Sequence, residues 1–189
     1  ADYTFLKGDK NWWRQAVIYQ IYPRSFADGN ADGIGDLKGI ISRVPYLKSL
    51  GIDAIWMSPF YPSALADGGY DVDDYRNVDP RIGTLEEFDA MIEALHKVGI
   101  RVIADIVPNH SGSNHVWFQA ALKAAPGSPE RERYIFRDGL GPNGDVRPSE
   151  LSSHFGPTGW TRITEPDGTP GQWYMHLFAS EQPDFNWDN

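Results

Sequence analysis

The same pattern occurs in two segments of this chain. Apolar residues spaced as on one face of a helix are followed by a glycine and then by a continuous apolar run. Apolar residues recur every three to four positions over 37–50, and Gly51 comes next. The second segment begins at Thr84 and Glu87, which form a capping box, and stops at Gly99. We therefore predict two helices, each followed directly by a strand.

Three short runs rich in β-branched and aromatic residues, 16–22, 52–57 and 100–107, have the composition of strands. The first of them ends at Pro23. Because the runs are almost continuously apolar, the pattern favours a parallel sheet that is buried on both faces. Strands that alternate with helices in this way predict an α/β fold.

Residues 111–189 differ in character from residues 1–110. Glycine and proline are frequent over 126–171, which predicts loops and short antiparallel strands. One short helix is expected over 114–124 and one strand over 172–178. Because long irregular stretches in compact proteins are usually functional, we interpret this region as an insertion that overhangs the carboxyl ends of the strands.

Composition excludes several classes of protein. A chain of 189 residues fits one domain, or one domain with an insertion. Its formal net charge of −9 argues against nucleic-acid binding, and no apolar run approaches the roughly 20 residues of a membrane span. The chain has no cysteine, so it forms neither a disulfide nor a thiolate site, and we expect a reducing, cytoplasmic location.

A run of oxygen-bearing side chains between the first strand and the first helix has the spacing of a loop that wraps a hard cation. Gly33 permits the sharp turn that such a loop needs, whereas Gly39 stands where a full EF-hand has a bidentate glutamate. We expect a structural Ca²⁺ or Mg²⁺ site completed by water, with a solvated Asp/Gly turn as the alternative. The expected ligands are the side chains of Asp28, Asn30, Asp32 and Asp36 and the carbonyl of Ile34.

Polar residues gather just past the second and third apolar runs, where parallel strands of a barrel present an active site. Asp67 and Tyr70 lie on a glycine-containing turn, suited to holding a sugar hydroxyl and stacking on a sugar ring. An Asp-Gly turn with a buried tyrosine is the simpler explanation. Asp105 is costly inside an apolar strand unless it is paired, and Asn109 and His110 follow where that strand leaves the sheet. This second group favours function over a purely structural histidine.

These motifs, in this order, resemble the N-terminal part of the α-amylase superfamily (glycoside hydrolase family 13), within its α-glucosidase and oligo-1,6-glucosidase branch. The similarity spans essentially the whole chain. The matching segments are Ala16–Phe26, the loop 28–36, Trp56–Pro62, Gly69–Tyr75, Asp105–His110 and Gln182–Trp187.

The resemblance implies a fold, an activity and a set of site residues. Residues 1–110 would form about three βα units of a (β/α)8 TIM barrel, and 111–189 an irregular α+β insertion after strand 3, ending just before strand 4. The activity would be that of a retaining exo-α-glucosidase that releases terminal glucose from maltose-type oligosaccharides. The loop 28–36 would be the family's calcium site. Substrate would be bound by Asp67, Tyr70, His110, Phe155 and Gln182, with Asp105 and Asn109 in support.

The same resemblance places the nucleophilic Asp after strand 4 and the acid Glu after strand 5, both beyond Asn189. We therefore expect the 189 residues alone to be inactive and to require the remainder of the barrel, in the same or a second chain. An oligo-1,6-glucosidase or a trehalose or isomaltulose synthase is the nearest alternative. A non-catalytic sugar- or metal-binding fragment is the second, and a hydrolase that uses the loop's metal ion is weaker because that loop has no nearby base.

Overall fold

The structure, a computed structural model, describes residues 8–189. The chain forms two compact units. The first unit comprises the residues up to Pro62 together with Arg76–Ile106, and the second comprises Ser63–Tyr75 together with Val107–Asn189. These units do not coincide with the predicted ranges 1–110 and 111–189, since 63–75 and 107–110 pack with the later residues.

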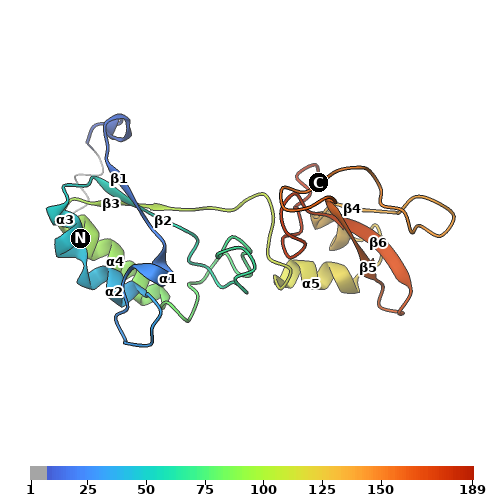
Figure 1. The fold of residues 1–189 in the computed structure, drawn as a ribbon, viewed down its shortest axis with the longest axis horizontal. Helices are drawn as coiled ribbons and strands as arrows, with labels where there is room; N and C mark the ends of the chain where they lie inside the picture. Colours follow the sequence, from blue (N-terminus) through green and yellow to red (C-terminus); the bar gives the residue numbers. More distant parts are fainter. Residues whose placement is uncertain (1–7) are drawn as a thin grey trace. The chain divides into compact units, whose positions relative to one another are not determined.

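A parallel three-stranded sheet is the centre of the first unit (Figure 1). Its strands are β1 (Ile18–Ile21), β2 (Ala54–Met57) and β3 (Arg101–Ala104), in that order. Tyr19 is in register with Ile55, which is in register with Val102. The predicted parallel α/β arrangement is thus confirmed, with each strand shorter than the apolar run that predicted it.

The helices of this unit are α1 (Pro23–Phe26), α2 (Leu37–Ser42), α3 (Val44–Ser49) and α4 (Leu85–Lys97), after a short 3-10 turn η2 (Trp12–Arg14). The single helix predicted over 37–50 is divided in two at Arg43. Pro45 explains the break, because proline has no N–H to donate back along the helix but is tolerated in a first turn. Thr84 accepts from the Glu87 N–H at 3.2 Å and caps α4, as predicted.

The core of the first unit lies where α2, α3 and α4 pack together, on one side of the strands in Figure 1. The central strand β2 is mostly buried, whereas Ile18 of β1 is 45% exposed and β3 is only partly covered. The expectation of burial on both faces is therefore met by β2 alone among the described strands of this sheet. Fully buried side chains of this core are Leu37, Ile40, Leu47, Ile55, Met57, Met91 and Leu95.

A buried ion pair joins α1 to the segment before α4. Asp79 is 1% exposed and lies 3.1 Å from Arg24 Nη2 and 2.5 Å from Arg81 Nη2. Burial alone would raise the pKa of Asp79, but hydrogen bonds from Arg81 and the charges of Arg81 and Arg24 outweigh it and lower the pKa. The ionised carboxylate is therefore favoured in the folded state.

This ion pair predicts a loss of stability in acid. A lowered pKa contributes stability that is present above the unfolded value of 3.8 and is lost as the pH falls through the lower folded value. In the wild type, we expect the urea concentration at the unfolding midpoint to decrease as the pH is lowered below 4. The drop should be smaller in Asp79→Asn, which is less stable at neutral pH. Equal pH dependence in both proteins would contradict this.

The second unit holds an antiparallel sheet of three strands, in the order β4 (Phe136–Arg137), β6 (Pro170–Met175) and β5 (Trp160–Thr164). Helix α5 (Val116–Lys123) and the 3-10 turn η3 (Arg131–Arg133) precede it. These are the short helix and antiparallel strands that the glycine- and proline-rich composition predicts. Its core consists of Phe118, Ala121, Tyr134, Phe136, Ile163 and Tyr174.

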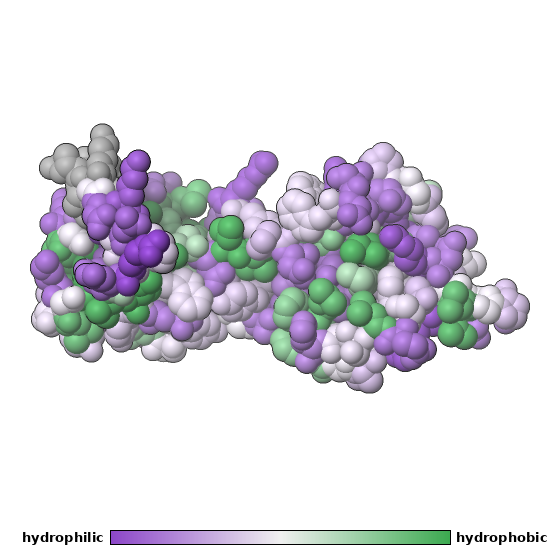
Figure 2. All heavy atoms as spheres, turned by 90° about the horizontal axis from the view of Figure 1, so that it is seen from above, coloured by the Kyte–Doolittle hydropathy of each residue, from purple (hydrophilic) through white to green (hydrophobic). Residues whose placement is uncertain are grey.

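The surfaces of both units are mixed in polarity. On the face shown in Figure 2, hydrophobic residues form small groups among hydrophilic ones. Among residues 8–189, no helix has the length and apolar character needed to cross a bilayer.

Candidate active site

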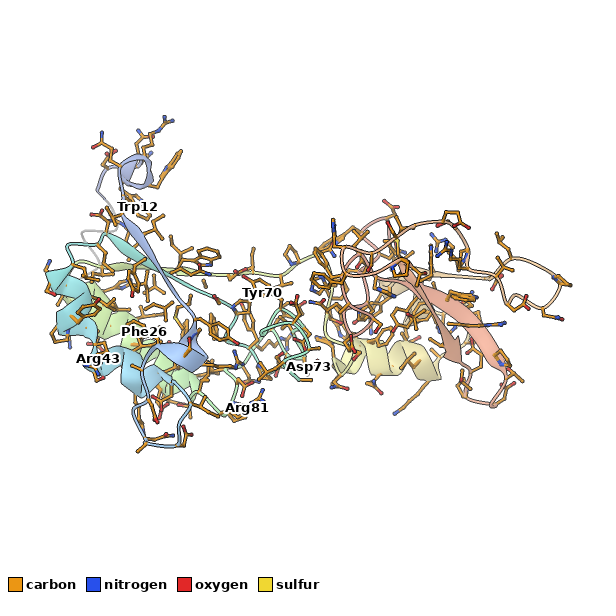
Figure 3. All side chains as sticks on the ribbon, viewed as in Figure 1. Trp12, Phe26, Arg43, Tyr70, Asp73 and Arg81 are labelled. Carbon is orange, nitrogen blue, oxygen red and sulfur yellow. The ribbon has the colours of Figure 1, made fainter. Side chains whose placement is uncertain are left out.

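The segment 63–75 forms a tight loop, in which Ser63 and Val72 pair in an isolated antiparallel β-bridge. Asp71 is buried and accepts the backbone N–H groups of Ala66 at 3.0 Å and Asp67 at 3.1 Å. Gly68 has a φ of +57°, a conformation that favours glycine, and so allows the chain to turn directly after Asp67. Asp67 thus lies on a loop whose backbone is fixed by hydrogen bonds to the Asp71 carboxylate. Figure 3 labels Tyr70 and Asp73 on the same loop.

His110 is the buried centre of the site, at 4% exposure. Its Nε2 lies 3.1 Å from the carbonyl oxygen of Tyr70, and its Nδ1 lies 3.1 Å from Asn109 Nδ2. Because a carbonyl can only accept, the geometry assigns the proton to Nε2 and leaves Nδ1 to accept from Asn109. Burial lowers the pKa of His110, against the opposing effects of the Tyr70 carbonyl and of Asp67 and Asp71. The neutral ring is therefore favoured in the folded state.

Gln182 connects this histidine to the loop carboxylate. Its side chain is fully buried, and its Nε2 donates to Asp67 Oδ2 at 2.9 Å and lies 3.1 Å from His110 Nε2. Its Oε1 accepts the Ala179 N–H at 3.0 Å, which fixes the orientation of the amide. Residues 67, 110 and 182, far apart in the sequence, therefore meet in one place, with a hydrogen bond from Gln182 to Asp67 and a close contact between Gln182 and His110. We call them the Asp67 cluster.

An aromatic wall adjoins the Asp67 cluster. The Phe178 ring lies 5.3 Å from the His110 ring, and His154 and Phe155 lie 5.0 and 5.8 Å from Phe178. The predicted binding residue Phe155 is 61% exposed and reaches the cluster through Phe178. Phe178 itself was not predicted as a site residue. Its only signal in the sequence is its place four residues before Gln182, at the end of the predicted strand.

Asn109 is held behind the cluster by a buried carboxylate. Asp184 Oδ1 accepts from Asn109 Nδ2 at 3.3 Å and from the Leu177 N–H at 3.0 Å. Burial raises the pKa of Asp184, partly offset by hydrogen bonds from Leu177 and Asn109 and by the charge of His176. These contacts fit the supporting role predicted for Asn109, which stays a prediction.

Asp105, the other predicted support residue, belongs to the first unit, just after β3. Its Oδ2 accepts from Trp56 Nε1 at 3.2 Å, and its carbonyl accepts from the Tyr61 hydroxyl at 2.8 Å. Its carboxylate is thus oriented by the neighbouring strand β2, and its role in the site stays a prediction.

The side chains of the oxygen-rich loop 28–36 accept hydrogen bonds from the backbone of the same loop. Asp28 accepts the N–H groups of Asn30, Ala31 and Gly33 at 2.7–3.0 Å, and the Gly33 bond in particular lowers its pKa. Asp36 caps α2 by accepting from Gly39 N at 2.7 Å. No three His, Cys, Asp or Glu side chains among residues 8–189 are grouped so as to hold a metal. The donors are chemically suited to Ca²⁺, but the carboxylates do not converge on one point.

The model of the α-amylase catalytic domain matches residues 20–189. This chain belongs to the α-amylase family. The predicted family resemblance is therefore confirmed, together with an α/β fold that corresponds to the N-terminal portion of that family's barrel.

Curated relatives with similar sequences include glucosidases and a trehalose-6-phosphate hydrolase. The oligo-1,6-glucosidase of Parageobacillus thermoglucosidasius is 45% identical over 96% of this chain and 31% of the relative. The trehalose-6-phosphate hydrolase of Escherichia coli (strain K12) is 46% identical over 95% of this chain and 31% of the relative. The chain thus spans about a third of the length of these relatives.

Two solved structures are similar as well. A MutB mutant in complex with the substrate sucrose superposes with a TM-score of 0.87, at 45% identity over 96% of this chain and 31% of that one. The isomaltulose synthase from Erwinia rhapontici NX5 gives a TM-score of 0.86, at 47% identity over 94% of this chain and 30% of that one.

Proposed function

We propose that this α-amylase family member is the glucose-binding part of a retaining exo-α-glucosidase, which releases terminal non-reducing glucose from maltose-type oligosaccharides. The Asp67 cluster is the observation that carries this proposal. It combines a half-buried carboxylate, a neutral imidazole and an aromatic wall on one compact unit, which are the groups that recognise a sugar.

Each member of the cluster has a distinct role in this proposal. Oδ2 of Asp67 is held by Gln182, so its Oδ1 is left to accept from sugar hydroxyls in a charge-assisted bond. The Nε2–H of His110, now held by the Tyr70 carbonyl, is the donor for which a sugar hydroxyl would compete. Because the tight loop 63–75 carries Asp67, it would stop a longer chain from extending past the terminal glucose.

Bond cleavage needs two further carboxyl groups, about 5–5.5 Å apart, in a retaining enzyme. We assign none of the site residues described above as the nucleophile or the acid. We propose that the nucleophile and the acid lie in sequence beyond Asn189, and that α-glucoside oligosaccharides and the remainder of the barrel are the partners of this chain.

Assay on p-nitrophenyl α-glucoside tests this proposal. The 189-residue chain alone should show no turnover, whereas a chain extended to the length of the relatives should release p-nitrophenol. Turnover by the 189 residues would show that the carboxylates are already present. An inactive extended chain that binds maltose would favour the non-catalytic sugar-binding alternative.

Cleavage of α-1,6 bonds is the second candidate, because several relatives are oligo-1,6-glucosidases and the similar structures include an isomaltulose synthase. The ratio of kcat/KM for isomaltose to that for maltose would decide between the two linkages. Isomaltulose or trehalulose formed from sucrose would favour the isomerase alternative.

We also propose that the loop 28–36 binds Ca²⁺ or Mg²⁺ as a structural ion. The support is its oxygen-only donor set. The ion would be held by the side chains of Asp28, Asn30, Asp32 and Asp36 and the Ile34 carbonyl, after a local rearrangement.

An ion that binds only the folded state raises the melting temperature. We expect 5 mM CaCl₂ to raise it by several degrees relative to EDTA, and Asp28→Asn with Asp32→Asn to abolish the rise. Asp89→Asn, at an exposed position of α4, serves as the control. An unchanged melting temperature in the wild type would leave the loop as a solvated turn.

A further inference from the structure

A cavity of about 630 Å³ lies in the second unit, and no residue of the Asp67 cluster lines it. Its walls come from the end of α5 and residues 124–126, from the segment around Asp138–Gly144, and from the hairpin that joins β5 to β6. Its volume falls within the range of small-molecule sites in proteins, about 300–1,000 Å³.

The polar lining of this cavity is fixed by a buried arginine. Arg131 is fully buried, and its Nη1 donates to Glu165 Oε1 and to Gln172 Oε1, each at 3.0 Å. Gln172 Nε2 in turn donates to Asp138 Oδ1 at 3.0 Å. Three lining side chains are thus oriented before any ligand arrives, which lowers the entropic cost of binding.

Two glycines that line the cavity stand at positions with no room for a side chain. A Cβ at Gly171 would lie 2.3 Å from Glu165 Oε1, and one at Gly139 would lie 2.0 Å from the Gly144 carbonyl oxygen. The Gly171 carbonyl accepts from Arg162 Nε at 2.9 Å, which orients that guanidinium beside the cavity. The Arg162 side chain is therefore held in place at this side of the cavity.

The charges that line the cavity are nearly balanced. Arg131 neutralises Glu165, which leaves the cations Lys123 and Arg162 against the anions Asp138 and Asp167. The Lys123 side chain makes no hydrogen bond or ion pair with the other residues that the structure describes. A neutral ligand that both donates and accepts hydrogen bonds suits this lining better than an anion or a bare cation does.

Apolar surface is supplied by prolines and alanines, without an aromatic ring. Pro126, Pro166 and Pro170 line the cavity, and Ala124 and Ala125 lie beside them. Flat apolar patches between hydrogen-bonding groups suit the alternating C–H and hydroxyl faces of a pyranose ring.

We propose that this cavity is a second carbohydrate-binding site, which takes two or three units of a neutral oligosaccharide. It is separate from the Asp67 cluster and does not depend on the reaction that the complete protein performs.

Chemical-shift mapping of the protein with isomaltotriose and with maltotriose tests this site. Either sugar should shift the backbone amides of Lys123, Gly139 and Gln172, and the same shifts should persist in His110→Ala. Ala125→Trp, which fills the cavity from an exposed position, should weaken this binding at least tenfold. Lys123→Ala should weaken it less.

Asp145→Ala is the matched control, because Asp145 is exposed in the same unit but does not line the cavity. It should bind both sugars like the wild type. The proposal is wrong if neither sugar shifts the cavity amides, if Ala125→Trp binds as tightly as Asp145→Ala, or if His110→Ala abolishes all binding. Failure of the p-nitrophenyl α-glucoside assay would leave these results unchanged, so the two proposals fail separately.

Discussion

Asp67→Asn in the complete enzyme is expected to lower kcat/KM for maltose and isomaltose by about 10- to 150-fold. A hydrogen bond to a charged group contributes roughly 1.5–3 kcal/mol, and the amide cannot replace the carboxylate as an acceptor to both Gln182 and a sugar hydroxyl. Steady-state kinetics on both disaccharides measures the loss.

Gln182→Glu separates the role of the Gln182 amide, which donates to Asp67, from the role of the Asp67 carboxylate. It places a second acceptor 2.9 Å from Asp67 Oδ2, so activity should fall and partly recover in Gln182→Glu with Asp67→Asn. Asp145→Asn, an exposed carboxylate of the same unit, should match the wild type. Full activity in Asp67→Asn would show that the Asp67 carboxylate does not bind the substrate.

Arg131→Met is expected to destabilise the second unit by about 3–5 kcal/mol, the usual cost of breaking a buried pair from one side. Arg131 is fully buried and also donates to the Ala121 carbonyl at 2.7 Å and to Gln172. Its loss leaves Glu165, whose side chain is 15% exposed, without its partner. The urea midpoint of the transition that reports on this unit should fall accordingly.

Two further variants show whether burial sets that cost. Arg147→Met breaks the pair with Glu150, whose side chain is 88% exposed, and should cost less than about 1 kcal/mol. Arg131→Met with Glu165→Leu removes both charges and should recover part of the lost stability. A similar loss in Arg131→Met and Arg147→Met would contradict the account.

Local signals in the sequence predict most of the first unit. Gly51 and Gly99 end the helices, Thr84 caps α4, and the three apolar runs become β1, β2 and β3 in parallel order. The predicted continuous helix over 37–50 is wrong only at Arg43, where the sequence already carried the cause in Pro45.

The Asp67 cluster depends on contacts that periodicity does not reveal. Asp67 and Gln182 are 115 positions apart, and His110 and Gln182 are 72 apart. Only the family resemblance placed them together, since local propensity says nothing about which distant loops meet. Phe178 was missed for the same reason: on sequence alone it is one more aromatic residue in a strand.

A crystal structure of the complete protein with glucose tests the central claim most directly. The account predicts one glucose whose hydroxyls lie within hydrogen-bonding distance of Asp67 Oδ1 and His110 Nε2, beside the Phe178 ring. Glucose that contacts neither side chain, while Gln182 still donates to Asp67 and still contacts His110, would contradict the account.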